Sequence, residues 1–296
     1  MSTIVIRKAV PVRKVRSSSM FVDTCKGVWA RGGGKAGVVI FGFVLVCVLL
    51  GPFVTPWGVN QMDLLHMFSG PSATHLFGTD AIGRDLLTRI LYGGRYSLAL
   101  GITAAVLACV TGAVIGSVAG YFGGATESVI MRFVDIWSSI PSLLLCILVS
   151  TAFGPGFFNT VIALSIGEVP IFIRLIRGQI LSQRSAEYLE AAESINCSRA
   201  SIMFRHLLPN VISPLIVQLT MDVGQMIVLA ASLSFIGLGV QPPTPEWGAL
   251  LADGRSHILN YPYLIMFPGV VIAITVLAMN LIGDALRDAL DPRLRA

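Results

Sequence analysis

Four long stretches of this chain contain no charged residue, and they limit its possible folds more than any other feature. They cover residues 36–62, 96–126, 136–167 and 257–283. A helix needs about 20 mostly apolar residues to cross a bilayer, so each stretch is long enough, and Gly154-Pro155-Gly156 divides the third. Since backbone groups in lipid must pair within their own segment, we expect an all-α membrane protein.

The composition supports this interpretation. Charged residues make up 12% of the chain and hydrophobic residues 54%, whereas soluble domains carry about 25% charged residues. The first apolar stretch begins near Ala36 and is too long for the core of a signal peptide, so we expect it to remain as a span. Neither the five cysteines nor the four histidines have metal-binding spacing, and we expect no disulfide framework, metal or cofactor in this chain.

The apolar pattern predicts six spans, at residues 36–57, 96–121, 130–152, 158–176, 211–236 and 263–284. Both tails and the loops after spans two and four then share one side of the membrane. That side carries 17 of the 21 Lys and Arg residues, which by the positive-inside rule makes both termini cytoplasmic. The basic N-terminal tail lies directly before a span, so we interpret it as an orientation signal and expect no nucleic-acid partner.

The predicted regions are a cytoplasmic basic tail (1–35), a first span with an external segment (36–95), a core of five spans (96–284) and a cytoplasmic C-terminal tail (285–296). Small residues recur at every fourth position in the second span and therefore share one helix face, which predicts close helix packing. They are Ala104, Ala108, Gly112, Gly116 and Gly120. The packing partner can be a helix of this chain or of another chain.

The segment between spans four and five, about residues 178–210, is polar and rich in helix formers. One apolar helix face is predicted at the spacing i, i+3, i+4 and i+7, formed by Tyr188, Ala191, Ala192 and Ile195. Asn196 can adopt the left-handed conformation that closes a helix, and Ser198 can cap a second short helix that ends before Pro209. The pattern predicts a helix-turn-helix on the cytoplasmic face, either a docking element or an ordinary amphipathic connector.

Glu190-Ala191-Ala192, Asn196 and Leu208-Pro209 together resemble the EAA loop of ABC importer permeases. The family pattern has glycine where Asn196 stands and an apolar residue where His206 stands. Five further segments resemble those of permeases of dipeptide, oligopeptide and nickel importers, and they occur in the same order along the chain. The particular resemblance is to the second, shorter permease of the peptide importers. The five segments are residues 77–85, 119–124, 140–144, 237–248 and 283–292.

The resemblance implies a type I ABC importer permease fold with six transmembrane helices and a cytoplasmic EAA coupling loop, embedded in the lipid of the bacterial cytoplasmic (inner) membrane. It implies a second homologous permease, two cytoplasmic ATPase subunits and an extracytoplasmic solute-binding protein as partners. This chain has no G-x-x-x-x-G-K-[ST] phosphate loop. ATP and Mg²⁺ are therefore expected in the partner ATPases, and this chain is not expected to be an enzyme.

Site residues follow from the resemblance and from the position of polar groups. ATPase coupling is expected at Glu187, Glu190, Ala191, Ala192, Asn196, Arg199 and Pro209. Glu168 and Asp222 lie at membrane depth and are predicted to line the pathway, or else to pair inside the protein. Arg132 and Asp135, three residues apart, are expected to pair. Contacts with the binding protein, or alternatively a stable interfacial loop, are predicted for Asp80, Arg84, Asp85, Glu246 and Trp247.

The expected solutes are dipeptides and oligopeptides. Nickel chelates, glutathione and opines remain alternatives, because in this family the binding protein largely imposes selectivity. A secondary transporter driven by an ion gradient is a further alternative, although it would not need a docking loop.

Overall fold

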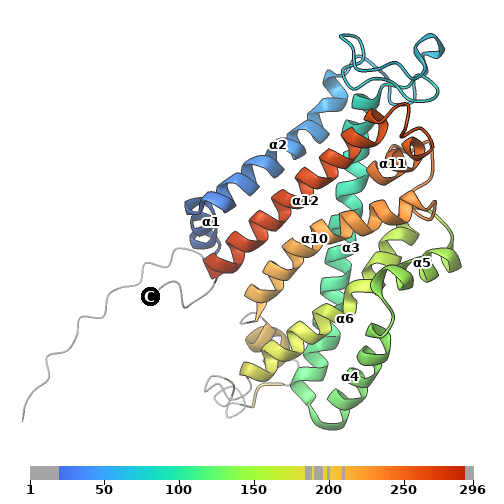
Figure 1. Cartoon of the computed structure of the whole chain (residues 1–296). Coiled ribbons are helices and arrows are strands. Elements are labelled where there is room, and N and C mark those ends of the chain that lie inside the picture. The colour runs from blue at the N-terminus through green and yellow to red at the C-terminus, as the bar shows by residue number, and fades with distance from the viewer. Residues whose placement is uncertain (1–19, 184–188, 190–195, 199–200, 209–210, 291–296) are drawn as a thin grey trace, which may run out of the picture.

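The computed structural model describes residues 20–183, 189, 196–198, 201–208 and 211–290, and in these ranges the regular elements are all helical. The long helices are α2 (Gly32–Val54), α3 (Leu86–Phe122), α6 (Phe157–Gln183), α10 (Ile212–Phe235) and α12 (Tyr263–Leu290) (Figure 1). The shorter elements are α1 (Met20–Ala30), the 3₁₀ turn η1 (Leu64–His66), α4 (Gly124–Ser138), α5 (Ser142–Phe153), the π-helical turn η2 (Ile202–Leu207) and α11 (Trp247–Arg255).

Among the described residues, five helices are long and apolar enough to cross a membrane, and the bent pair of α4 and α5 makes a sixth crossing if it is counted as one. The third predicted span, residues 130–152, is therefore not one continuous helix, because α4 and α5 meet at 86°. The break coincides with Pro141, which lacks the backbone N–H needed to continue α4. Apolar residues stand on both sides of the break, so hydropathy alone did not reveal it.

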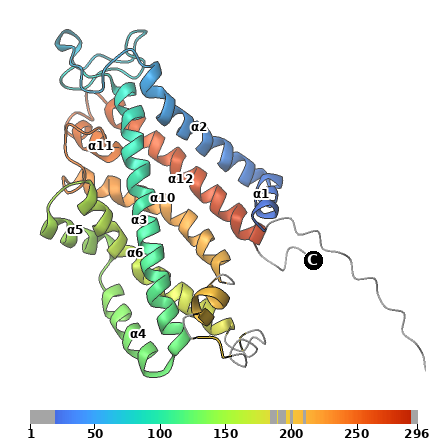
Figure 2. The same cartoon turned by 180° about the vertical axis from the view of Figure 1, so that it is seen from behind.

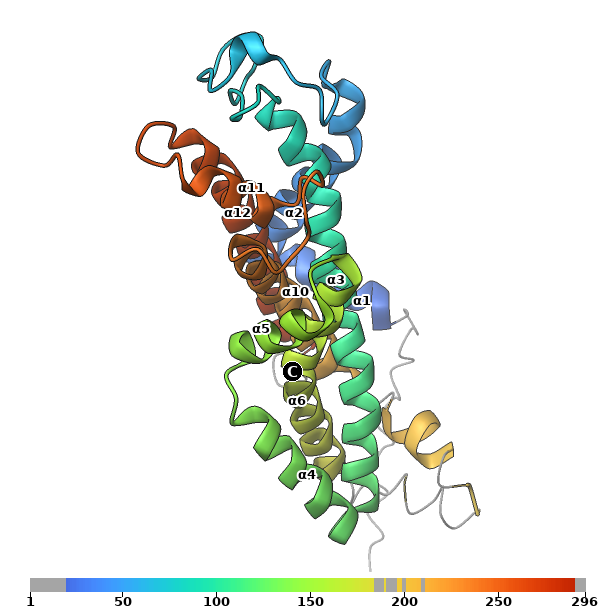
Figure 3. The ribbon, with the colours of Figure 1, turned by 90° about the vertical axis from the view of Figure 1, so that its right-hand side faces the viewer.

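The elements are arranged along α3, which runs almost the full length of the molecule (Figure 1). The loop from α2 to α3 and helix α11 lie at the end where α3 begins. Helix α4 and the turn η2 lie at the other end (Figure 3). Helices α2 and α12 pack together, and α10 packs between α12 and α3 (Figure 2).

The start of α2, the first long helix, lies close to the end of α12, the last one. Arg31, just before α2, donates a hydrogen bond from Nη2 to the carbonyl oxygen of Asp288 near the end of α12, at 2.9 Å. Gly27 of α1 also lies against Ala289. The segments adjoining the two tails therefore lie on the same side of the bundle, as an even number of crossings requires.

The small residues of α3 pack against α6. A Cβ atom added to Gly112 would collide with Phe172 and lie 3.0 Å from the carbonyl oxygen of Val169. One turn later, a Cβ atom on Gly116 would lie 2.7 Å from the carbonyl oxygen of Ile173. Such close backbone approach maximises van der Waals contact, which drives helix association in lipid. The packing partner that the sequence left open is thus a helix of the same chain.

Because of this packing, the loss of stability on replacing a glycine by alanine should depend on where the glycine lies. We expect Gly112→Ala to lower the free energy of unfolding by about 1–3 kcal/mol, because the added methyl group overpacks the α3–α6 contact. Gly42→Ala in α2 is a matched control, since no atom lies within 4 Å of the added Cβ. Thermal unfolding of the solubilised protein measures both effects. Equal midpoints for the two variants would contradict the packing described here.

Candidate functional site

The segment between α6 and α10 carries the residues predicted to couple to ATPase subunits. Glu187, Glu190, Ala191, Ala192, Arg199 and Pro209 lie outside the described residues. Asn196 is exposed and has a φ of 58°, which confirms its predicted left-handed conformation. Ser198 Oγ accepts a hydrogen bond from the backbone N–H of Ser201 at 3.2 Å, which confirms Ser198 as the cap of the helical turns that follow.

The second half of this segment returns to the core of the bundle. Ile202, Leu207 and Val211 are buried, as is Leu189 in the first half. The segment connects α6 directly to α10, so a force applied to it acts on the ends of both helices.

At the opposite end, two aspartates order the loop that precedes α3. Asp80 Oδ1 accepts a hydrogen bond from the backbone N–H of Arg84 at 2.9 Å, and Asp80 Oδ2 accepts one from Arg84 Nε at 2.6 Å. Asp85 Oδ1 accepts from Thr88 N and Thr88 Oγ1, at 2.8 and 2.7 Å, and so caps α3. Asp85 Oδ2 lies 3.0 Å from Nδ1 of the buried His75.

Glu246 and Trp247 fix α11 on α3. Glu246 Oε2 accepts a hydrogen bond from Ala249 N at 3.0 Å, which caps α11, while Oε1 accepts one from Ser97 Oγ at 2.8 Å. Trp247 N donates to Ser97 Oγ at 3.0 Å. The indole of Trp247 is fully buried, and its Nε1 donates to the carbonyl oxygen of Ile90 at 2.9 Å.

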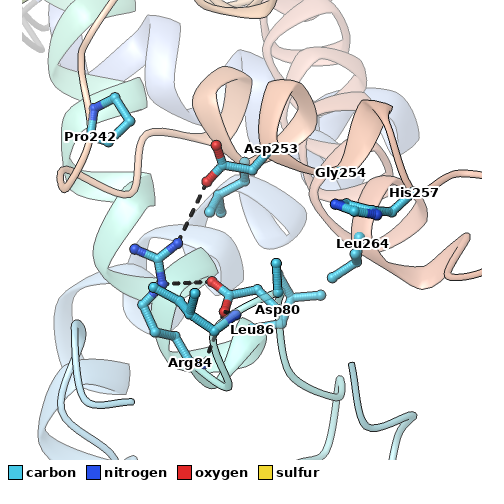
Figure 4. A pocket seen from close by; sticks show the side chains of 11 residues that line it. Asp80, Arg84, Leu86, Pro242, Asp253, Gly254, His257 and Leu264 are labelled. Atoms are coloured by element: carbon cyan, nitrogen blue, oxygen red, sulfur yellow. Dashed lines mark hydrogen bonds and ion pairs between the residues drawn. The ribbon is translucent and has the colours of Figure 1, made fainter. Parts of the chain in front are cut away.

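A pocket of about 200 Å³ lies between these two external loops (Figure 4). Asp253 Oδ2 lies 3.7 Å from Nη2 of Arg84 and 3.7 Å from Nη2 of Arg89, and Asp80 Oδ2 lies 3.9 Å from Arg89 Nε. Two carboxylates therefore face two guanidinium groups. Burial raises the pKa of the Asp253 carboxyl above its ordinary value, although Arg89 and Arg84 act in the opposite direction.

The predicted contact of these external residues with a binding protein stays a prediction. Asp80, Asp85, Glu246 and Trp247 are buried and bonded within this chain, and Arg84 is partly buried. These residues hold the external loops in shape. A binding protein would therefore contact the exposed surface of the loops and not these buried side chains.

Glu168 of α6 and Asp222 of α10 are also buried. Gln218 Nε2 donates a hydrogen bond to Asp222 Oδ1 at 3.3 Å. Among the described residues, neither carboxyl group forms an ion pair. The alternative that these acids pair with basic residues inside the protein is therefore not seen in this conformation. Neither group lies on an open surface, and their predicted role in the pathway remains a prediction.

The predicted pair of Arg132 and Asp135 is wrong. Asp135 Oδ1 instead lies 3.1 Å from Nη2 of Arg174 on α6, and Glu127 of α4 pairs with Arg177 of α6 in the same way. The reason is spatial, because α6 packs beside α4 and brings its own arginines to the acidic face of α4.

Sequence reasoning missed an apolar hollow of about 450 Å³ formed by α5, α10, α11 and α12. Apolar residues that face such a hollow cannot be told from apolar residues that face lipid by hydropathy. Ser232 and Gly269, the small or polar residues among them, were the available signals. The residues that line it are Leu143, Ile147, Val228, Ala231, Ser232, Phe235, Ile236, Leu251, Gly269 and Ile272.

The indole hydrogen bond offers a test of the external architecture. We expect Trp247→Phe to lower the free energy of unfolding by about 1–3 kcal/mol, because it removes the buried indole hydrogen bond to the carbonyl of Ile90 and leaves unfilled space in the core. Trp29→Phe, at a side chain that is 51% exposed, should change stability far less. Thermal unfolding followed by circular dichroism compares the two, and equal losses would show that the buried bond contributes nothing specific.

Comparison with known proteins places this architecture in a family. Residues 112–296 match the family model described as binding-protein-dependent transport system inner membrane component. The dipeptide transport system permease protein DppC of Alkalihalophilus pseudofirmus is 42% identical over 259 residues, covering 88% of this chain and 85% of that protein. The di/tripeptide transport system permease protein DppC of Pseudomonas aeruginosa is 38% identical over 288 residues, covering 94% and 95%.

A third relative, the glutathione transport system permease protein GsiD of Pectobacterium atrosepticum, is 42% identical over 258 residues, covering 86% of each chain. Among solved structures, a chain of the MetNI methionine ABC transporter in inward-facing conformation superposes with a TM-score of 0.57 at 18% identity. That match covers 69% of this chain and 97% of the other, and it shows the shared fold. The chain therefore belongs to the family of binding-protein-dependent transport system inner membrane components and has the fold of an ABC importer permease.

Proposed function

We propose that this chain forms half of the translocation pore of an ATP-driven importer whose solutes are dipeptides or other short peptides. The observation that carries the proposal is similarity over nearly the whole chain to permeases of dipeptide and di/tripeptide transport systems, at 42% and 38% identity. The apolar hollow between α5, α10 and α12 supports it, since it offers a wall for a passage completed by a second permease.

The proposal includes an orientation and a set of partners. Both tails and the segment between α6 and α10 face the cytoplasm, which the distribution of basic residues supports. Two cytoplasmic ATPase subunits bind this segment and supply ATP and Mg²⁺ chemistry. A solute-binding protein delivers the solute to the opposite end, where Asp80, Asp85 and Glu246 hold the external loops in place.

The geometry suggests how movement reaches the pore. Closure of the ATPases displaces the segment between α6 and α10. Both helices pack on α3, so a displacement at their cytoplasmic ends tilts them relative to α3. Helix α10 also contributes four residues to the hollow, and its tilt therefore changes the shape of the passage.

Substitution in the coupling segment tests the proposal. In liposomes that hold the complete complex, we expect Glu190→Ala to reduce uptake of a labelled dipeptide and solute-stimulated ATP hydrolysis by about tenfold or more, as loss of a charged hydrogen bond at an interface would. Glu193→Ala, in the same segment but outside the Glu-Ala-Ala pattern, is the matched control and should retain both activities.

Two results would contradict this assignment. Equal activity of the Glu190 and Glu193 variants would remove Glu190 from the coupling contact. Undiminished uptake without ATP would replace the importer with a carrier driven by an ion gradient.

Glutathione is the second candidate solute, because a glutathione permease is as similar to this chain as a dipeptide permease. Competition separates the two candidates. We expect an excess of unlabelled dipeptide to abolish uptake of the labelled dipeptide, and an equal excess of glutathione to leave it nearly unchanged. Stronger competition by glutathione would reverse the assignment.

A further inference from the structure

Glu168 and Asp222 place two carboxyl groups inside the bundle without a counter-charge. Their residues are 3% and 4% exposed. Asp222 Oδ2 makes no hydrogen bond within the described residues, and Asp222 Oδ1 accepts only the 3.3 Å bond from Gln218. No hydrogen bond or ion pair to a described residue involves the Glu168 carboxyl.

Helix α3 packs against the parts of α6 and α10 that carry the two acids. A Cβ atom added to Gly101 would lie 3.1 Å from the carbonyl oxygen of Val223, next to Asp222 on α10. A Cβ atom added to Gly112 would lie 3.0 Å from the carbonyl oxygen of Val169, next to Glu168 on α6. Helices α6 and α10 also pack directly against each other, and both acids are buried among these three helices.

The groups around the pair are neutral. Cys109 of α3 is buried, and Cys146 of α5 lies against α6 next to Glu168, since a Cβ atom added to Gly167 would lie 3.0 Å from its Sγ. Cys146 Sγ donates to the carbonyl oxygen of Ala163. On the far side of α10, helix α12 presents the apolar Val276 and Met279.

The basic side chains closest along α6 are already engaged elsewhere. Arg174 pairs with Asp135 and Arg177 with Glu127, both on α4. Within the described residues, no Lys, Arg or His forms a hydrogen bond or an ion pair with either buried carboxyl.

Two ionised carboxylates cannot share such a site at low cost. A buried charge without a partner costs several kcal/mol, and a second like charge nearby adds to that cost. Buried acids of this kind are neutralised by a proton or a bound cation.

We propose that Glu168 and Asp222 form a proton-binding site that holds at least one proton while α6 and α10 are packed as described and releases it when they separate. The release is a simple ionisation, in which a carboxylic acid O–H gives its proton to water and leaves a carboxylate. The inference rests on the proposed function for the movement of the helices, but the presence of the proton follows from burial alone.

The position of the pair gives the proton a regulatory effect. Helices α6 and α10 flank the segment predicted to engage the ATPases, and the packed arrangement binds the proton more tightly than an arrangement open to water. Lower pH therefore favours the packed arrangement, and higher pH favours separation of the two helices.

Infrared spectroscopy tests the proton directly. For the complete complex at pH 7 without nucleotide, we expect a carbonyl band of a protonated carboxyl group that shifts in D₂O and is lost or displaced in Glu168→Gln and in Asp222→Asn. Asp135→Asn removes an exposed, ion-paired carboxylate and should leave that band unchanged. Absence of any difference between wild type and both buried-site variants would overturn the proposal, as would a band that sodium ions remove at constant pH.

A second measurement tests the regulatory effect. We expect solute-stimulated ATP hydrolysis by wild type to rise with pH over the range in which the band titrates. The combined Glu168→Gln, Asp222→Asn variant, which mimics the protonated pair, should lose that part of the pH dependence. A pH profile identical to wild type would exclude regulation by the pair. A complex that shows the band but imports no peptide would retain the proton site and reject the proposed solute instead.

Discussion

Close backbone contact between α3 and α6 is the interaction on which the rest of the structure depends. Lipid gives helices little hydrophobic reason to associate, so their contact must come from tight packing. Gly112 and Gly116 provide it against α6, and Gly101 provides it against α10. With α3 as the common support, α6 and α10 are held side by side. This arrangement fixes the ends of the segment between α6 and α10 and keeps Glu168 and Asp222 buried in the bundle.

The sequence was sufficient to predict those features that depend only on residues close together along the chain. The apolar stretches predicted the crossings, Asn196 its left-handed turn and Ser198 its cap, because each depends on a few consecutive residues. Features that depend on distant segments were missed. The partner of Asp135 comes from another helix, and the break before α5 falls in a stretch of uniform hydropathy. The coupling role of Glu190 still depends on family resemblance, since it lies outside the described residues.

The polar residues of the external segment 77–85, which resembles a family motif, mainly stabilise the structure of this chain. Gly78 and Gly83 adopt φ values of 81° and 77°, which residues with a side chain rarely adopt. The hydroxyl of Thr79 accepts a hydrogen bond from Ser69 N at 2.9 Å, and the two aspartates bond to the loop and to α3. Most polar positions of the motif are thus used within the chain, so its chemistry alone does not identify a partner.

The corner between α4 and α5 restricts what can surround this protein. A helix that stops leaves its last carbonyl groups without helical partners, and irregular backbone at membrane depth is tolerated only where protein or water covers it. Residues 138–141 are exposed in the single chain. Ser139 and Ile140 donate to the carbonyl groups of Ile136 and Trp137, and acyl chains cannot satisfy the carbonyl groups that remain. The corner must therefore face another subunit or a water-filled space, and lipid must lie along other faces, such as the exposed side of α2.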